Sequence, residues 1–107
     1  SGAALSPKIG WYLYCSSKAA FKFLIESYAA EDKKRKYINI SPGLIKTKMQ
    51  NQICKIDEKK ISFKNKFKLL NKNNKVPFPD EVAENILNTV QNLKIKKNGV
   101  YLDIRKR

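Results

Sequence analysis

Histidine is absent from this chain of 107 residues, and cysteine occurs only at Cys15 and Cys54. Protein zinc sites are built from clustered histidine and cysteine side chains, and these two cysteines form no Cys-x-x-Cys pair. The sequence therefore predicts no metal site. We expect both cysteines to be free thiols in a reducing cytoplasm.

Glycine and long apolar runs are also scarce. The four glycines are Gly2, Gly10, Gly43 and Gly99, and none belongs to a glycine-rich turn of the kind that cradles dinucleotide phosphates after a strand. No apolar run approaches the ~20 residues of a membrane-spanning helix, so we expect no membrane partner. The length allows one domain with a modest core.

Negative charge is the third shortage, with nine acidic residues against 23 basic ones and a formal net charge of +14. Such a balance could serve a nucleic acid or another anion, because basic side chains that neutralise phosphates supply most non-specific affinity. Lysine, asparagine and isoleucine make up 41 residues, however, a mixture that AT-rich coding bias produces, and the lysines are spread over several segments. Arginine, the preferred residue for base contacts, occurs three times. We therefore do not expect nucleic acid to be the main partner.

Helical spacing of apolar residues is present in two segments. Residues 13–31 are rich in strong helix formers and are predicted to form the longest helix, with two apolar faces. Residues 80–93 carry a single apolar stripe, and Pro79 or Asp80 is the expected cap. The lysine-rich residues 46–75 are expected to form one or two loosely held helices.

Two short segments have the composition of strands. Residues 37–41 end at a Pro-Gly pair and residues 100–104 follow an Asn-Gly pair, while residues 1–11 are expected to form a strand end and a loop. No hairpin joins the two strands, so they are predicted to be parallel. Parallel strands need neighbours and helices on both faces, so two strands make an incomplete sheet.

Tyr14 and Lys18 are the pair of residues with the clearest chemical content. They are four positions apart, so on a helix they lie one turn apart on one face. A free tyrosine titrates near pH ~10, and a fixed positive charge beside it favours the phenolate. Such a phenol could exchange protons with a substrate.

The setting of this pair carries a family resemblance. Ser1 lies 13 residues before Tyr14, and residues 39–49 read NISPGLIKTKM. A serine, a Tyr-x-x-x-Lys pair and a Pro-Gly loop with a threonine together resemble the C-terminal half of the short-chain dehydrogenase/reductase family. The resemblance extends to residues 79–83 and to the last strand.

Within the family, the opening residues 1–4 and the ending residues 99–105 are most similar to the branch of sepiapterin reductases and benzil reductases. The resemblance implies a three-layer α/β fold of Rossmann type with a doubly wound parallel sheet. It implies that residues 1–107 are the C-terminal portion of one such domain, without its N-terminal dinucleotide-binding half. A chain of that kind is expected to be inactive alone.

The resemblance also implies catalytic roles. Tyr14 would donate a proton to a carbonyl oxygen, Lys18 would acidify that phenol and bind the nicotinamide ribose, and Ser1 would donate a second hydrogen bond to the carbonyl oxygen. These roles suit carbonyl reduction, in which negative charge grows on oxygen as hydride arrives. The alternative is a core tyrosine, a surface lysine and a loop serine.

A cofactor loop is implied for Pro42, Gly43, Ile45 and Thr47. The Pro-Gly pair would turn the chain sharply, Ile45 would offer backbone groups to the nicotinamide carboxamide, and Thr47 would offer its hydroxyl to the carboxamide or the diphosphate. The alternatives are an ordinary turn and an N-cap at Thr47. The implied cofactor is NADPH, with NADH possible.

The function implied is reduction of a small-molecule ketone or diketone by a homo-oligomeric parent enzyme. The competing hypotheses are a non-catalytic remnant and a basic module that binds nucleic acid or other anions. Five apolar residues could line a substrate pocket or belong to the core: Trp11, Tyr12, Met49, Phe63 and Phe67.

Overall fold

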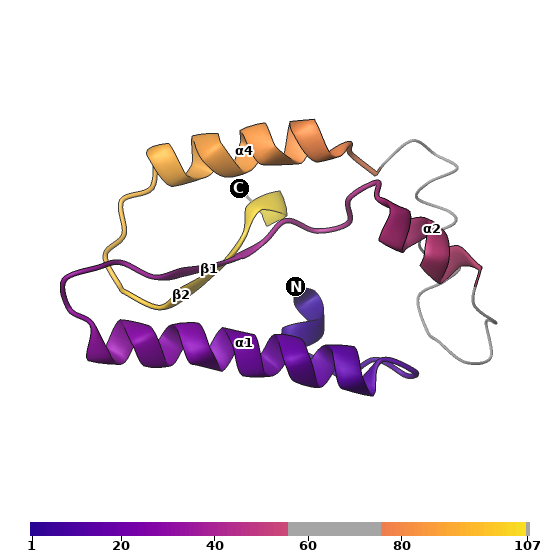
Figure 1. The fold of residues 1–107 in the computed structure, drawn as a ribbon. Coiled ribbons are helices and arrows are strands. Elements are labelled where there is room, and N and C mark those ends of the chain that lie inside the picture. Colours follow the sequence, from indigo (N-terminus) through magenta and orange to yellow (C-terminus); the bar gives the residue numbers. More distant parts are fainter. Residues whose placement is uncertain (56–75, 107) are drawn as a thin grey trace.

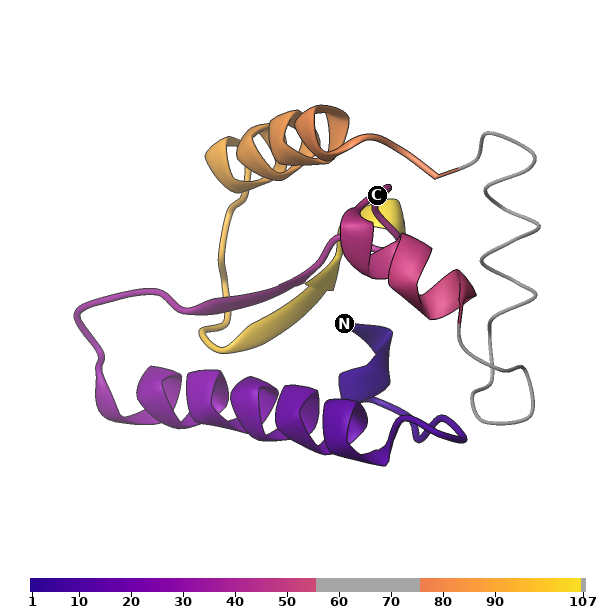
Figure 2. The ribbon, with the colours of Figure 1, turned by 45° about the vertical axis from the view of Figure 1, so that its right-hand side comes forward.

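The computed structural model describes residues 1–55 and 76–106. The described elements are η1 (Gly2–Ala4), α1 (Tyr12–Glu31), β1 (Ile38–Ser41), α2 (Lys48–Cys54), α4 (Pro79–Gln91), β2 (Val100–Asp103) and η2 (Ile104–Lys106), where η marks a 3-10 helix. Figures 1 and 2 show α1 on one face of the β1–β2 sheet and α4 on the other. The predicted three-layer α/β arrangement is therefore present.

The two strands pair in parallel, with Ile38 opposite Val100 and Ser41 opposite Asp103. Side chains alternate between the faces of a sheet, and the amide of Asn39 donates to the carbonyl of Lys22 in α1 at 3.3 Å. Polar positions of both strands therefore face α1, and aliphatic positions face α4. The parallel pairing confirms the prediction and excludes a hairpin.

Asn98 fastens the two strands at their amino ends. Its carbonyl oxygen accepts from the Tyr37 N–H at 2.6 Å, and its amide nitrogen donates to the carbonyls of Arg35 at 3.0 Å and Ala29 at 3.3 Å. Gly99 follows with φ 74°, and a Cβ there would lie 3.0 Å from the Cβ of Ala29. One side chain thus joins the end of α1 to both strands.

Where α1 meets the start of β2, the contact is made by two small residues. Ala29 is 4% exposed and lies against Gly99. Away from the sheet α1 carries exposed aromatic and aliphatic side chains: Leu13, Phe23 and Leu24 point away from the sheet, and Tyr12, Phe21 and Tyr28 lie on the flanks. Two apolar faces were predicted for this helix, and the described residues cover one of them.

The start of α4 corrects one prediction. Phe78, rather than Pro79 or Asp80, is the N-cap residue, and its N–H donates to the Glu81 carboxylate at 3.0 Å. Pro79 occupies the first helical position, where its missing N–H costs no hydrogen bond and its fixed φ suits the helix. Val82 then buries its side chain on the inner side of α4.

The predicted helices and strands agree with the structure within two residues at each end. Residues 1–11 differ, because Gly2–Ala4 forms a 3-10 turn capped by Ser1 instead of a strand end. Of residues 46–75, the structure describes α2, and the remainder from residue 56 lies outside the described residues. Cys15 is a free thiol as expected, whereas the side chain of Cys54 lies outside the described part.

Among residues 1–55 and 76–106, no helix combines the length and apolar character needed to cross a membrane.

We predict that Asn98→Ala lowers the free energy of unfolding by about 2 kcal/mol or more, because it leaves part-buried backbone groups without partners. Urea unfolding followed by circular dichroism measures this change. The matched control is Asn85→Ala on the exposed side of α4, where alanine favours the helix and the change should stay below about 0.7 kcal/mol. Equal effects of the two substitutions would contradict the fastening role of Asn98.

Candidate active site

Tyr14 and Lys18 lie towards the carboxyl ends of the strands because α1 runs antiparallel to β1. Lys22 is bonded to Asn39 in the second position of β1, and Glu26, one turn later, lies against Gly99 at the start of β2. Going one and two turns back along α1 therefore reaches Lys18 and then Tyr14 at the opposite end of the sheet. Ligands of open parallel sheets bind at this end.

The two side chains are in contact. The Lys18 ammonium lies 5.4 Å from the centre of the Tyr14 ring, within the range of a cation–π interaction. The Trp11 ring also packs against the Tyr14 ring in an edge-to-face arrangement, with ring centres 5.4 Å apart and planes inclined at 74°. Both Tyr14 and Lys18 are half-buried, so the pair is held in place while remaining accessible.

Ser1 lies at the same end of the sheet. The 3-10 helix η1 that follows Ser1 packs against α1, and Figures 1 and 2 show the N-terminus beside that helix. The Ser1 hydroxyl oxygen accepts from the Ala3 N–H at 3.3 Å. The structure thus places Ser1 beside the helix that carries Tyr14 and Lys18, the other two residues predicted to be catalytic.

The Pro42–Gly43 turn follows β1, and Gly43 lies against Arg105, which comes just after β2. Gly43 has φ 83°, and a Cβ at this position would overlap the Cδ of Arg105. The sharp turn predicted here is therefore present. The left-handed backbone favours glycine, and the Arg105 side chain would have to shift to admit an added Cβ. Ile45 is half-buried in the same loop.

Asp103 and Arg105 form an ion pair beside this turn, which the sequence analysis did not single out. The Arg105 Nε donates to Asp103 at 2.8 Å, and Nη2 donates to the second carboxylate oxygen at 2.5 Å. This fork of hydrogen bonds lowers the pKa of Asp103 to about 2. The pair orders η2 against Gly43, a long-range contact that has no local sequence signal.

Thr47 occupies the N-cap position of α2, but its hydroxyl caps no backbone N–H of that helix. Just before it, the Lys46 N–H donates to the Pro77 carbonyl at 2.9 Å, and the Lys46 ammonium lies 4.8 Å from the centre of the Phe78 ring. The loop is thereby tied to the entry of α4. Thr47 is therefore the N-cap by position, but its side chain does not make the capping bond of the predicted alternative. Among the described residues its hydroxyl has no hydrogen-bond partner and could bind a ligand.

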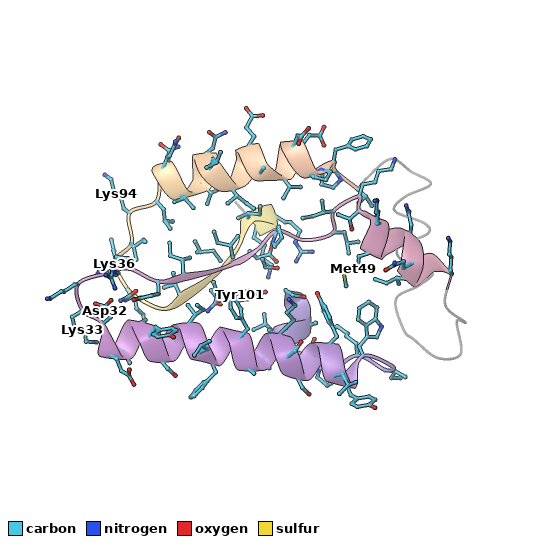
Figure 3. The ribbon with its side chains drawn as sticks, viewed as in Figure 1. Asp32, Lys33, Lys36, Met49, Lys94 and Tyr101 are labelled. Atoms are coloured by element: carbon cyan, nitrogen blue, oxygen red, sulfur yellow. The ribbon has the colours of Figure 1, made fainter. Side chains whose placement is uncertain are left out.

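The burial of two polar side chains, Gln50 and Tyr101, was not predicted from the sequence. Gln50 in α2 is 4% exposed, and within the described part of the chain neither atom of its amide has a hydrogen-bond partner. The buried hydroxyl of Tyr101 likewise has no partner among the described residues. Figure 3 shows Tyr101 between the sheet and α1. Tyr101 is the register partner of Asn39, so both side chains lie on the face of the sheet that α1 covers.

The predicted pocket residues are only partly placed. Trp11 is half-buried, Tyr12 is 74% exposed, and Met49, 47% exposed, points from α2 towards the first turns of α1 in the view of Figure 3. Phe63 and Phe67 lie outside the described residues. In the described ranges, no group of three or more metal-ligating side chains could hold a metal ion.

Comparison with known families gives a match to the family described as short chain dehydrogenase over residues 1–58, more than half of the chain. The chain belongs to this family. The matched residues of this short-chain dehydrogenase include Ser1, Tyr14, Lys18 and the whole Pro42–Thr47 loop.

Relatives of this chain include the benzil reductase ((S)-benzoin forming) of Bacillus subtilis, 32% identical over 98% of the chain and 44% of that enzyme. The sepiapterin reductase of Meriones unguiculatus is 31% identical over 82% of the chain and 33% of that enzyme. The crystal structure of the KRED1-Pglu enzyme superposes with a TM-score of 0.83 at 27% identity, over 95% of the chain and 44% of that structure. The chain spans less than half the length of these relatives. The family, the branch and the partial Rossmann fold are as the sequence predicted.

We predict that Gly43→Ala lowers the free energy of unfolding by about 1–2 kcal/mol, since alanine is strained at φ 83° and Arg105 must shift to make room for it. Gly2→Ala is the control, because no atom lies within 4 Å of its added Cβ. Denaturant unfolding measures both variants.

A second readout tests the contact with Arg105. The lowered pKa of Asp103 contributes stability that is present above about pH 4 and is lost as the pH falls through about 2. If Gly43→Ala displaces Arg105, this acid-side loss becomes smaller. An unchanged acid limb together with unchanged stability would show that Gly43 does not pack on Arg105.

Proposed function

We propose that the protein containing this chain is an oxidoreductase that reduces a ketone or diketone with a nicotinamide cofactor. The observation that carries the proposal is the contact between the Lys18 ammonium and the Tyr14 ring at the carboxyl end of a parallel sheet. Membership of the short-chain dehydrogenase family and the likeness to reductases support it.

The chemistry assigned to the chain is proton delivery. Tyr14 donates its phenolic proton to the carbonyl oxygen as negative charge develops there. Lys18 stabilises the phenolate that remains, and the Ser1 hydroxyl donates a hydrogen bond to the same oxygen. A bound nicotinamide supplies the hydride.

The residues at this end suit such a cofactor. Thr47 has a hydroxyl that caps no helix N–H. Lys18 has ammonium hydrogens to donate to ribose hydroxyls. Ile45 has backbone groups in the loop that begins with the Pro42–Gly43 turn. We propose NADPH, with NADH as the alternative, on the likeness to the reductase branch. The Lys18 ammonium serves both cofactor and phenol.

The chain alone is proposed to be inactive, because its four glycines include no phosphate-cradling turn. The tests below therefore use the longest protein that contains these residues. A non-catalytic remnant is the alternative, and it predicts that neither NADPH nor NADH binds to that protein.

We further propose that the parent enzyme is a homo-oligomer. Apolar side chains of α1 that point away from the sheet are 47–72% exposed: Leu13, Phe23 and Leu24. A second copy of the same face would remove this apolar surface from water.

We predict that Tyr14→Phe lowers kcat by at least about 100-fold, because it removes the transferable proton and keeps the ring that packs on Trp11. Tyr12→Phe is the matched control, since Tyr12 is 74% exposed and two positions away. Steady-state reduction of an aromatic diketone such as benzil measures both variants. Near-full activity of Tyr14→Phe would refute Tyr14 as the proton donor.

Lys18→Ala is predicted to weaken cofactor binding and to lower kcat together, because one ammonium serves the ribose and the phenol. Cofactor fluorescence gives the Kd for NADPH and for NADH, and thereby also decides between them. Lys22→Ala, one turn later, loses only its pair with Glu26 and should change neither quantity by more than about twofold. A loss of rate without a loss of affinity would remove Lys18 from the cofactor site.

A further inference from the structure

Two loops meet at the amino ends of the strands, opposite the candidate active site. Residues 32–37 connect α1 to β1, and residues 92–99 connect α4 to β2. Asn98 bonds to the Arg35 carbonyl and the Tyr37 N–H, so segments some 60 residues apart in the sequence lie side by side.

These loops concentrate positive charge. Seven of the fifteen basic residues in the described part of the chain lie here and are exposed: Lys33, Lys34, Arg35, Lys36, Lys94, Lys96 and Lys97. We call this set the basic end. Figure 3 shows Lys33, Lys36 and Lys94 together at one end of the molecule. The fold therefore gathers lysines that are spread out in the sequence.

Few carboxylates offset this charge. Three acidic residues lie at or beside these loops. Glu31 is exposed, Glu26 is paired with Lys22, and Asp32 accepts from the Tyr37 hydroxyl at 2.7 Å and from Arg35 at 3.3 Å. Within the described residues, no carboxylate forms an ion pair with any of the six lysines of the basic end. Their ammonium groups are thus available to an anionic partner.

An aromatic surface adjoins the basic end. The rings of Tyr28 and Tyr37 are stacked with centres 5.8 Å apart and planes inclined at 17°. Tyr28 is 48% exposed and belongs to the last turn of α1, beyond the apolar face assigned above to a second copy. Exposed aromatic rings beside lysines are the elements with which proteins stack unpaired bases while neutralising phosphates.

We propose that the basic end binds single-stranded nucleic acid through its phosphate backbone, with Tyr28 as a stacking surface and without base specificity. Six of its seven cations are lysines, which act as point charges rather than as bidentate base readers. A membrane fits less well, because an interfacial site needs exposed apolar side chains, and the two large aliphatic residues of the loops, Leu93 and Ile95, are half-buried.

The test measures binding of a fluorescein-labelled oligothymidylate of about 20 nucleotides as sodium chloride is varied. About four or five phosphate contacts give a slope of log affinity against log salt near −3. Replacing Lys33, Lys36 and Lys94 together by Gln should weaken the slope by about 2 and lower the affinity at least about tenfold.

The charge-matched control replaces Lys48, Lys55 and Lys106 by Gln, three exposed lysines outside the basic end. This control should keep the slope within about 0.5 of the parent value. Thermal unfolding of each variant verifies that the fold is retained. Equal losses in the two triple variants would overturn the proposal, because binding would then follow net charge and not this surface.

Two further arms distinguish nucleic acid from other polyanions. Tyr28→Leu should weaken oligothymidylate binding at least about fivefold through lost stacking and leave binding of inorganic polyphosphate unchanged. Equal affinity of this variant and the parent for oligothymidylate would overturn the proposal. Tighter, basic-end-dependent binding to phosphatidylserine vesicles than to the oligonucleotide would overturn it in favour of a membrane.

Discussion

The parallel pairing of β1 and β2 is the constraint on which the other features depend. Parallel strands place both amino ends at one edge and both carboxyl ends at the other. Asn98 fixes the pairing at the amino edge by bonding to Tyr37, Arg35 and Ala29. The same register brings the Pro42–Gly43 turn against Arg105 at the carboxyl edge. One pairing therefore assembles two chemically different ends of the molecule.

The position of α1 decides what the carboxyl edge contains. The hydrogen bond from Asn39 to Lys22 and the close approach of Gly99 to Ala29 fix both the direction and the register of the helix. A shift of one residue would rotate the helix by about 100° and would turn Tyr14 and Lys18 away from Ser1. The geometry of the candidate active site thus depends on small residues and backbone contacts two or three turns away from it.

Local features could be predicted from the sequence, and long-range contacts could not. The helical spacing of residues 13–31 and the breakers around residues 37–41 define their elements almost to the residue, because such signals act over one or two turns. Phe78 could not be predicted as the N-cap of α4, because its side chain has no oxygen that could accept from a helix N–H. Its own N–H donates to the Glu81 carboxylate instead. The predicted site residues followed from a motif with fixed spacing.

Contacts between distant segments explain the remaining differences. The Asn98 bonds link residues more than 60 positions apart, and the Asp103–Arg105 pair matters because it meets Gly43 from another strand. The lysines of the two loops were considered dispersed because they are dispersed along the chain. Their concentration at one edge follows from strand pairing, which composition does not determine.

The candidate active site and the basic end are far apart relative to electrostatic screening. The part of α1 between Lys18 and Asp32 spans about 20 Å at ~1.5 Å per residue, whereas charges in physiological salt are screened over about 8 Å. Neutralising the basic end with phosphates would therefore leave the field at Tyr14 nearly unchanged. The Lys18 ammonium, by contrast, contacts the Tyr14 ring directly, so the proposed chemistry depends on a local charge and not on the net charge of the chain.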